Sequence, residues 1–135
     1  MPITFHPAPG TVLMCDYSGF KPPEMVKKRL VVVISRKHRN LATVVPLSGT
    51  EPHPLEKCHH EMHDASLPVP FRGNRRWAKC DLITTVAFHR LDRVRVGKHP
   101  TTGKRMYHKK PVRPEDLRAI QEAIIHVLGL SGLTK

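Results

Sequence analysis

The sequence predicts a mainly β fold that is closed by one C-terminal helix. Short apolar segments recur from Thr11 onward and are separated by turns rich in Gly, Pro and Ser, which is the pattern of several short strands. After Pro114 the apolar residues recur every three or four positions, which is the spacing of an amphipathic helix. Strands followed by a single helix describe a small twisted antiparallel sheet or barrel with the helix packed on one face.

The first half of the chain contains the segments that should form the core. Residues 11–17 alternate in polarity and are expected to form a half-buried first strand. Residues 30–34, Leu-Val-Val-Val-Ile, are apolar on both faces and are expected to form a central strand that is covered on both sides. Residues 42–48 should form the next strand, with Pro46 marking an edge or a bulge. That strand ends at Ser48.

The second half continues with shorter strands and then the helix. Residues 57–63 alternate in polarity and predict a fourth strand, and residues 77–86 predict one strand or two short ones. Residues 93–108 alternate valine with arginine and reverse at a Pro-Thr-Thr-Gly turn, which predicts a hairpin with a basic outer face. The helix should begin at Pro114 and end before Gly129.

Length and composition exclude several classes of protein. With 135 residues, the chain is expected to form a single domain, 1–135. Its longest unbroken aliphatic stretch, residues 30–34, is far shorter than the roughly 20 residues of a membrane-spanning helix. The N-terminus lacks the pattern of a signal peptide. The three cysteines form no Cys-x-x-Cys pair, so neither a disulfide framework nor a zinc ribbon is indicated, and a cytoplasmic location is expected.

The charge of the chain is strongly positive. The 23 Lys and Arg residues outnumber the 11 Asp and Glu residues, which gives a formal net charge of +12. Such an excess favours a polyanionic partner, because binding releases counterions and attracts the partner over a distance. Nucleic acid is therefore the first partner to consider, and a basic surface that serves solubility alone is the alternative.

A cluster of possible metal ligands spans Cys58 to His63. Thiolate and imidazole are good zinc ligands. In a strand, however, Cys58 and His60 would face one way while His59 and His63 face the other, so no four ligands would converge. We therefore predict no metal site and no cofactor.

Several stretches together resemble the MazF/PemK family of toxin–antitoxin endoribonucleases over about residues 9–130. They are Gly10-Thr11-Val12, Glu24 followed by Arg29-Leu30-Val31-Val32-Val33-Ile34-Ser35, Val44-Val45-Pro46-Leu47-Ser48, residues 77–86 (WAKCDLITTV) and the helix end Val127-Leu128-Gly129-Leu130. The resemblance implies an SH3-like barrel, a homodimer, metal-independent cleavage of single-stranded RNA and neutralisation by an acidic antitoxin. The chain departs from the family pattern at Leu30, where proline is usual, and at Ser48, where the active-site residue is usually threonine.

The resemblance also implies a catalytic site. Cleavage of RNA without a metal uses the substrate's own 2′-hydroxyl, so the protein must remove that proton, stabilise the phosphorane and protonate the leaving oxygen. We expect Arg29 to stabilise the phosphorane with its planar fork of donors, Ser48 to add one hydrogen bond and Glu24 to act as the base. The alternatives are a structural ion pair for Arg29, a local strand-end hydroxyl for Ser48 and a solvated loop carboxylate for Glu24.

A second set of residues is expected to hold the RNA strand. Aromatic and basic residues alternate around Phe71 and Trp77, as a groove for single-stranded nucleic acid requires, although Trp77 itself is expected in the core. The expected RNA-binding residues are Lys27, Lys28, Arg72, Arg75, Arg76 and Lys79. The rival function is a toxin that blocks a protein such as a gyrase, as CcdB does, or that binds nucleic acid without cutting it. The presence of both Arg29 and a hydroxyl at Ser48 favours the nuclease.

Overall fold

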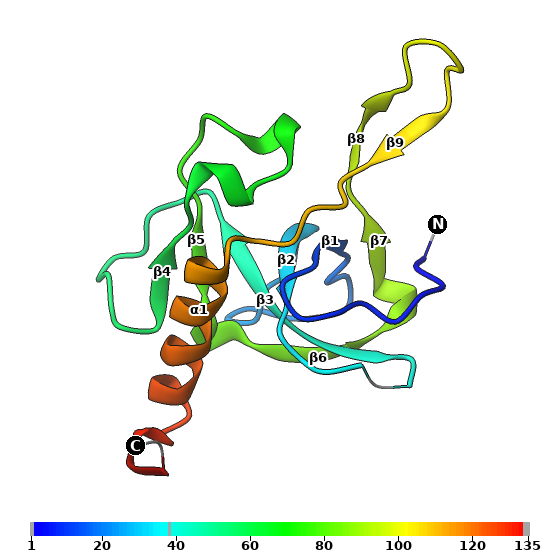
Figure 1. Cartoon of the computed structure of the whole chain (residues 1–135). Coiled ribbons are helices and arrows are strands. Elements are labelled where there is room, and N and C mark those ends of the chain that lie inside the picture. Colours follow the sequence, from blue (N-terminus) through cyan, green and yellow to red (C-terminus); the bar gives the residue numbers. More distant parts are fainter. Residues whose placement is uncertain (1, 38, 134–135) are drawn as a thin grey trace.

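The computed structural model describes residues 2–37 and 39–133, which form antiparallel β-sheet and one C-terminal α-helix (Figure 1). The predicted fold class is therefore confirmed. One sheet has the order β4-β5-β3-β2-β1-β7, with β6 also paired to β3, and β8 and β9 form a separate pair. The strands are β1 Val12–Cys15, β2 Arg29–Val33, β3 Leu41–Ser48, β4 His59–Glu61, β5 Trp77–Lys79, β6 Thr84–Ala87, β7 Leu91–Arg93, β8 Arg95–Lys98 and β9 Arg105–Tyr107, and the helix is α1 Pro114–Val127.

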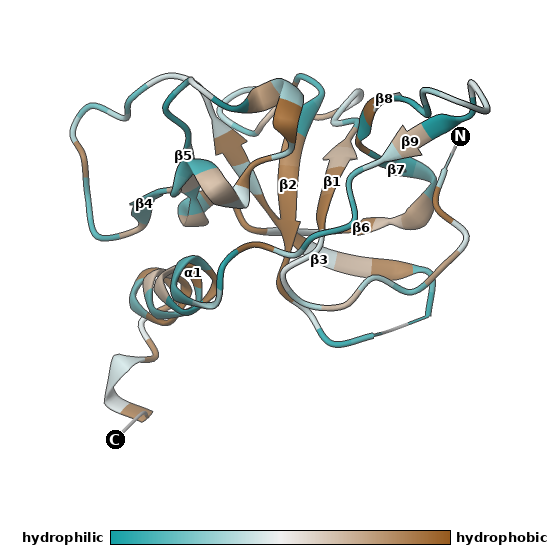
Figure 2. Ribbon diagram, turned by 45° about the horizontal axis from the view of Figure 1, so that its top comes forward, coloured by the Kyte–Doolittle hydropathy of each residue, from teal (hydrophilic) through white to brown (hydrophobic). Residues whose placement is uncertain are grey.

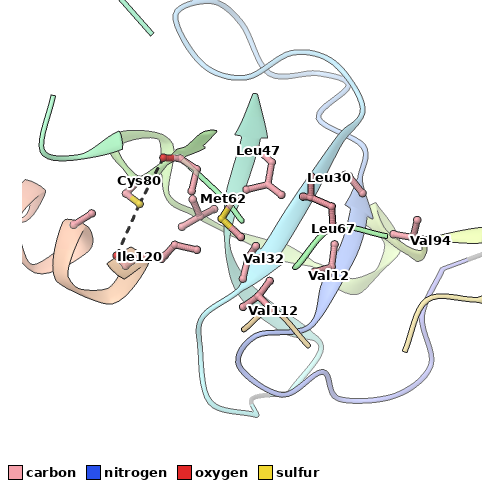
Figure 3. Close-up of a cluster of buried hydrophobic side chains, with 13 residues drawn as sticks. Val12, Leu30, Val32, Leu47, Met62, Leu67, Cys80, Val94, Val112 and Ile120 are labelled. Atoms are coloured by element: carbon pink, nitrogen blue, oxygen red, sulfur yellow. Dashed lines mark hydrogen bonds between the residues drawn. The ribbon is translucent and has the colours of Figure 1, made fainter. Parts of the chain in front are cut away.

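Strand β2 is buried on both faces, as its sequence predicts. Leu30 and Val32 pack in one apolar cluster, whereas Val31 and Val33 pack in a second cluster on the opposite face. Figure 3 shows the first cluster, in which Leu30 and Val32 lie among side chains from several other segments. Full burial of one such aliphatic side chain contributes about 1.5–3 kcal/mol. Figure 2 shows β2 as a largely hydrophobic strand inside the sheet.

Strand β3 is interior, so the prediction that Pro46 marks an edge strand is wrong. On one side β3 pairs with β2, and on the other side it pairs with β6 through residues 41–44 and with β5 through residues 47 and 48. Pro46 lies between these two neighbours. A proline lacks the backbone N–H that a continuous ladder needs, and here the change of neighbour removes that requirement.

The two short strands β5 and β6 are connected by a 3₁₀ turn, η3 (Cys80–Leu82). Of the two predicted alternatives for residues 77–86, one strand or two short ones, the second is therefore correct. The strand predicted over residues 57–63 is shorter than expected, because β4 ends at Glu61 and a 3₁₀ turn, η1 (Asp64–Ser66), follows. The basic hairpin is present as β8 and β9.

Helix α1 covers the first apolar cluster. Ile120 and Ala123 are buried in that cluster, and the Cys80 thiol lies 3.8 Å from the Ile120 carbonyl oxygen (Figure 3). No described helix is long and apolar enough to cross a membrane.

The limits of α1 are those that the sequence predicts. Pro114 occupies the first helical position, where its missing N–H costs nothing. At the other end Gly129 has a φ of +71°, and its N–H donates to the His126 carbonyl while the Leu130 N–H donates to the Ile125 carbonyl. This pair of bonds is the Schellman motif, which ends helices at a left-handed residue.

Asp116 fastens the start of α1 to the sheet. The Ser66 hydroxyl donates to one Asp116 oxygen, His60 Nε2 lies 2.7 Å from the other, and the His63 backbone N–H lies 3.3 and 3.4 Å from the two. The Ser66 oxygen in turn accepts the Arg113 N–H at 2.9 Å. The negative charge is also favoured by the positive end of the helix dipole.

Burial raises the pKa of the Asp116 carboxyl, but the hydrogen bonds from Ser66, His60 and His63 outweigh burial, so the pKa lies below its ordinary value. A carboxyl whose pKa is lower in the folded than in the unfolded state stabilises the fold while it is ionised. Its contribution is therefore present above the unfolded pKa and is lost as the pH falls through the folded pKa.

We predict that Asp116→Asn lowers the free energy of unfolding by about 1.5–3 kcal/mol at pH 7, because hydrogen bonds to a buried charge are lost. Urea titration followed by circular dichroism measures this change. Glu115→Gln, at the exposed neighbouring position, should change it by less than about 0.5 kcal/mol. The difference between wild type and Asp116→Asn should shrink below about pH 4. Equal stability of both variants at pH 7 would show that this network does not fasten the helix.

Candidate active site

Arg29 and Ser48 lie at the same end of the paired strands β2 and β3. The last pair of this antiparallel ladder is Val31 opposite Pro46, and Arg29 and Ser48 each lie two residues beyond it. Arg29 is the first residue of β2 and Ser48 is the last residue of β3. Both residues therefore lie at one end of the sheet.

The Arg29 guanidinium has unused hydrogen-bonding capacity. The side chain is half-buried, and its Nε atom is buried without a hydrogen-bond partner among the described residues. Arg29 also forms no ion pair with a described carboxylate. A buried donor without a partner is unfavourable by about 1–3 kcal/mol, and an anion bound at this place would supply the missing acceptor.

The Ser48 hydroxyl is engaged locally. Its Oγ donates to the Thr50 carbonyl at 3.1 Å and accepts the Thr50 N–H at 3.1 Å. This is the strand-end arrangement that was the alternative interpretation of the residue. The hydroxyl can rotate away from the carbonyl while Thr50 N–H still donates to it, so a ligand oxygen beside Ser48 can compete for its proton.

Glu24 lies in the loop between β1 and β2 and is exposed. Its carboxylate accepts the Lys21 backbone N–H at 3.2 Å, and it forms no ion pair with Arg29 within the described part of the chain. Glu24 instead lines a cavity of about 200 Å³ that also includes Tyr17 and Asp81.

Asp81 is a residue that the sequence interpretation did not select. It follows β5 in the turn η3, and its side chain is 40% exposed. Its proximity to Glu24 depends on two loops that are far apart in the sequence, so no local pattern identifies the pair. Two carboxylates on one cavity are a candidate pair for proton transfer.

Arg75 is already paired. It donates to the two Glu61 oxygens at 2.8 and 2.9 Å and lies 3.7 Å from Glu51. The hydrogen bond from Arg75 lowers the pKa of the Glu61 carboxyl. Its guanidinium carbon also lies 4.8 Å from the centre of the Trp77 ring. Because its charge is compensated, Arg75 is a weaker candidate for binding RNA than the sequence suggests.

Arg76 is the more available of the two neighbouring arginines. Its Nε atom is buried and has no hydrogen-bond partner in the described ranges, and its guanidinium carbon lies 5.2 Å from the Phe71 ring centre. The guanidinium also lies 3.6 Å from the position that a Cβ atom would take at Gly49. Gly49 follows Ser48 directly, so Arg76 is close to the end of β3.

The remaining predicted RNA-binding residues differ in availability. Lys27 and Lys28 are exposed and precede Arg29 directly. Arg72 is exposed, but its Nε donates to the Leu67 carbonyl at 3.0 Å. Lys79 is half-buried in β5 opposite His59. Trp77 is buried, as predicted.

Three possible metal ligands lie together. Ligand atoms of Cys58, His59 and Asp81 are within 4.8 Å of one another, so the prediction that Cys58 and His59 face opposite ways is wrong, because β4 begins only at His59. However, His59 Nδ1 accepts the Glu56 N–H at 3.1 Å, so the proton of a neutral ring is on Nε2. That proton blocks Nε2 as a ligand, and burial raises the pKa of the Cys58 thiol. These features do not fit a preformed metal site.

Comparison with solved structures defines the fold. MazF from Deinococcus radiodurans superposes with a TM-score of 0.63 at 11% sequence identity and covers 93% of this chain and 98% of that one. An endoribonuclease in complex with its cognate antitoxin, from a mycobacterial species, superposes with a TM-score of 0.60 at 20% identity and covers 92% and 96% of the two chains. The protein therefore has a MazF-like fold.

Comparison of sequences assigns the family. The family model for the PemK-like, MazF-like toxin of type II toxin-antitoxin systems matches residues 8–128. The chain belongs to this family, as the sequence motifs indicate. It is also 36% identical to YifN, an uncharacterized protein of Escherichia coli (strain K12), over 98% of this chain and 99% of that protein. An uncharacterized Haemophilus influenzae protein is 37% identical over 64% of this chain and 69% of its own length.

Proposed function

We propose that this protein is the toxin of a type II toxin–antitoxin system and that it cleaves single-stranded RNA without a metal ion. The observation that carries the proposal is the buried Nε of Arg29, which has no hydrogen-bond partner among the described residues, at the end of the central strands where Ser48 also lies. The family supports it, and two of the solved relatives are described as endoribonucleases from mycobacterial species.

Arg29 would stabilise the transition state in this mechanism. A guanidinium remains protonated at any physiological pH and offers donors in a fixed plane, which suits two non-bridging oxygens of a phosphorane. Because β2 is buried on both faces, the backbone that carries Arg29 is held in place before the substrate arrives. Donors that are oriented in advance stabilise developing charge without having to reorganise.

Ser48 would add a neutral hydrogen bond to the same phosphate. Its proton is directed to the Thr50 carbonyl in the free protein, so a phosphate oxygen must replace that carbonyl as the acceptor. Replacing the neutral Thr50 carbonyl by a charged phosphate oxygen as the acceptor is favourable, because hydrogen bonds to ionised groups are roughly twice as strong as neutral ones.

Glu24 would remove the proton of the 2′-hydroxyl. It is held by Lys21 N–H in the free protein, so the β1–β2 loop must bring it toward Arg29 when RNA binds. Asp81, on the same cavity as Glu24, is the second carboxylate available for proton transfer.

The biological setting follows from the same proposal. Two relatives were solved together with antitoxins, and the net charge of +12 of this chain would complement an acidic antitoxin. We propose that the protein acts in the cytoplasm as a homodimer and that the antitoxin covers the RNA-binding surface.

The decisive experiment is incubation of the protein with mixed-sequence RNA in EDTA, followed by analysis of the fragment ends. Fragments with a 2′,3′-cyclic phosphate and a 5′-hydroxyl are expected, because the 2′-hydroxyl is the nucleophile. Intact RNA together with inhibited DNA supercoiling by gyrase would refute the nuclease and favour the gyrase-blocking alternative.

We predict that Arg29→Ala lowers kcat by about 10²- to 10³-fold, the range for loss of one oxyanion-hole donor, with little change in RNA affinity. Ser48→Ala should have a smaller effect, because a neutral donor is weaker than a charged fork. Ser48→Thr should retain or raise activity, because the added methyl restricts rotation of the hydroxyl. Single-turnover cleavage assays measure these rates. If nuclease-free Arg29→Ala cleaves RNA at the wild-type rate, the assignment of the active site is wrong.

Arg75 and Arg76 provide a matched pair of variants. We predict that Arg76→Gln raises KM for RNA several-fold and that Arg75→Gln has a smaller effect, because Arg75 is already paired with Glu61 and Arg76 has no ion-pair partner among the described carboxylates. Steady-state kinetics at two salt concentrations measure the difference. A larger effect for Arg75→Gln than for Arg76→Gln would contradict this ordering.

A further inference from the structure

The hairpin formed by β8 and β9 carries a large share of the positive charge. We use the term basic arm for residues 93–110, which contain seven of the 23 Lys and Arg residues and no Asp or Glu. The remaining 16 basic residues share the rest of the chain with all 11 acidic residues. The charge excess is therefore concentrated on this segment.

Beyond Arg93, which ends β7, the basic arm stands apart from the main sheet. Its strands β8 and β9 pair with each other and form a separate two-stranded sheet, and Figure 1 shows the hairpin projecting beyond β7. Backbone hydrogen bonds order it along its length. The His108 N–H donates to the Val94 carbonyl at 2.8 Å near the base, and the His99 N–H donates to the Lys104 carbonyl at 2.7 Å near the tip.

The charges of the basic arm are not compensated within the protein. None of its seven Lys and Arg residues forms an ion pair with a carboxylate in residues 2–37 or 39–133. Like charges on one narrow hairpin repel each other, and a polyanion removes that repulsion and releases its own counterions on binding. The arm contributes no side chain to the buried core beyond Val94, so packing does not explain its composition.

A cavity lies at the base of the basic arm. Its volume is about 300 Å³, and its lining combines the apolar side chains of Phe5, Leu13 and Tyr107 with the positive side chains of Arg93 and Lys109. The Arg93 guanidinium carbon lies 3.8 Å from the centre of the Tyr107 ring. Aromatic and guanidinium planes beside a positive charge are the features that hold an unstacked nucleobase and its phosphate.

A protein partner fits this surface less well. Protein interfaces depend on buried aromatic and aliphatic anchors. Among the described residues of the arm, one large hydrophobic side chain is exposed, that of Met106, at 37% exposure. The surface offers repeated positive charge with one aromatic cavity instead. This chemistry matches a polynucleotide strand.

We propose that the basic arm and the cavity at its base form a second RNA-binding site, in which the arm contacts phosphates and the cavity holds one base. The inference rests on the proposed function, because it takes RNA as the substrate. The site is separate from Arg29 and Ser48 and contributes to affinity, so its loss should change KM and leave kcat intact.

The test removes three charges from the tip of the arm in Lys98→Gln/Lys104→Gln/Arg105→Gln. The control Arg36→Gln/Lys37→Gln/Arg39→Gln removes three charges from the exposed turn between β2 and β3, so both variants have the same net charge. The probe is a fluorescent, fully 2′-O-methylated RNA of 20 nucleotides, which cannot be cleaved through its 2′-oxygen. Fluorescence anisotropy gives Kd over a range of salt concentrations, and circular dichroism verifies that both variants are folded.

We expect the arm variant to bind this RNA at least 10-fold more weakly than the control and to reduce the slope of log K against log salt by about two, since each phosphate contact on a single strand contributes about 0.7. Its kcat on cleavable RNA should equal that of the control. Tyr107→Ala should weaken binding several-fold through loss of stacking, whereas Tyr107→Phe, which retains the ring, should not.

Equal Kd values for the arm variant and the control, in a protein that still cleaves RNA, would overturn the second site and leave the proposed function intact. If the wild-type protein neither binds nor cleaves RNA, the proposed function fails and the second site fails with it. If the arm variant binds RNA as the control does but no longer binds a poly-glutamate peptide, the arm binds an acidic protein and not RNA. That result would also overturn the inference.

Discussion

The burial of β2 on both faces is the constraint on which the rest of the structure depends. Two apolar clusters pack against alternate residues of this strand, so a slip of one residue would exchange the two sets of side chains. Such a slip is strongly opposed, because it also alters every pairing with β1 and β3. The register in turn leaves Arg29 and Ser48 at the same end of the two strands, each two residues beyond the Val31–Pro46 pair. The core thereby positions the residues of the candidate active site.

The distribution of charge follows from where the few carboxylates lie. Asp116 fastens α1 to the sheet, and Glu61 pairs with Arg75. These acidic groups compensate positive charge only close to themselves. Arg29 and Arg76 have buried Nε atoms without a hydrogen-bond partner among the described residues. The basic arm has no ion pair with a described carboxylate. Positive charge without a compensating carboxylate among the described residues is thus found at Arg29, at Arg76 and on the basic arm.

The sequence predicted those parts of the structure that depend on local patterns. The central strand and the limits of α1 at Pro114 and Gly129 follow from apolar periodicity and from backbone preferences, which act over a few residues. The prediction for Pro46 was wrong because the change of neighbour from β6 to β5 is a property of the whole sheet. Periodicity within one strand does not contain that information.

The candidate site, like the fold, was predictable from the sequence only where it depends on short sequence patterns. Arg29 and Ser48 were selected through family motifs, and the pairing of β2 with β3 leaves both at one end of the sheet. Three further contacts join segments that are distant in the sequence: the Arg75–Glu61 pair, the cavity shared by Glu24 and Asp81, and the approach of Asp81 to Cys58 and His59. Such contacts depend on loop conformation, which no short sequence pattern determines. They changed the interpretation of individual residues and not of the fold.

The central claim is that Arg29 and Ser48 act on one phosphate. A double-mutant cycle tests it most directly, with kcat measured in EDTA for wild type, Arg29→Ala, Ser48→Ala and the double variant. Residues that stabilise the same transition-state charge are strongly non-additive. We predict that the double variant is scarcely slower than Arg29→Ala alone. If the two losses in kcat instead multiply, the two residues act independently and do not share one phosphate.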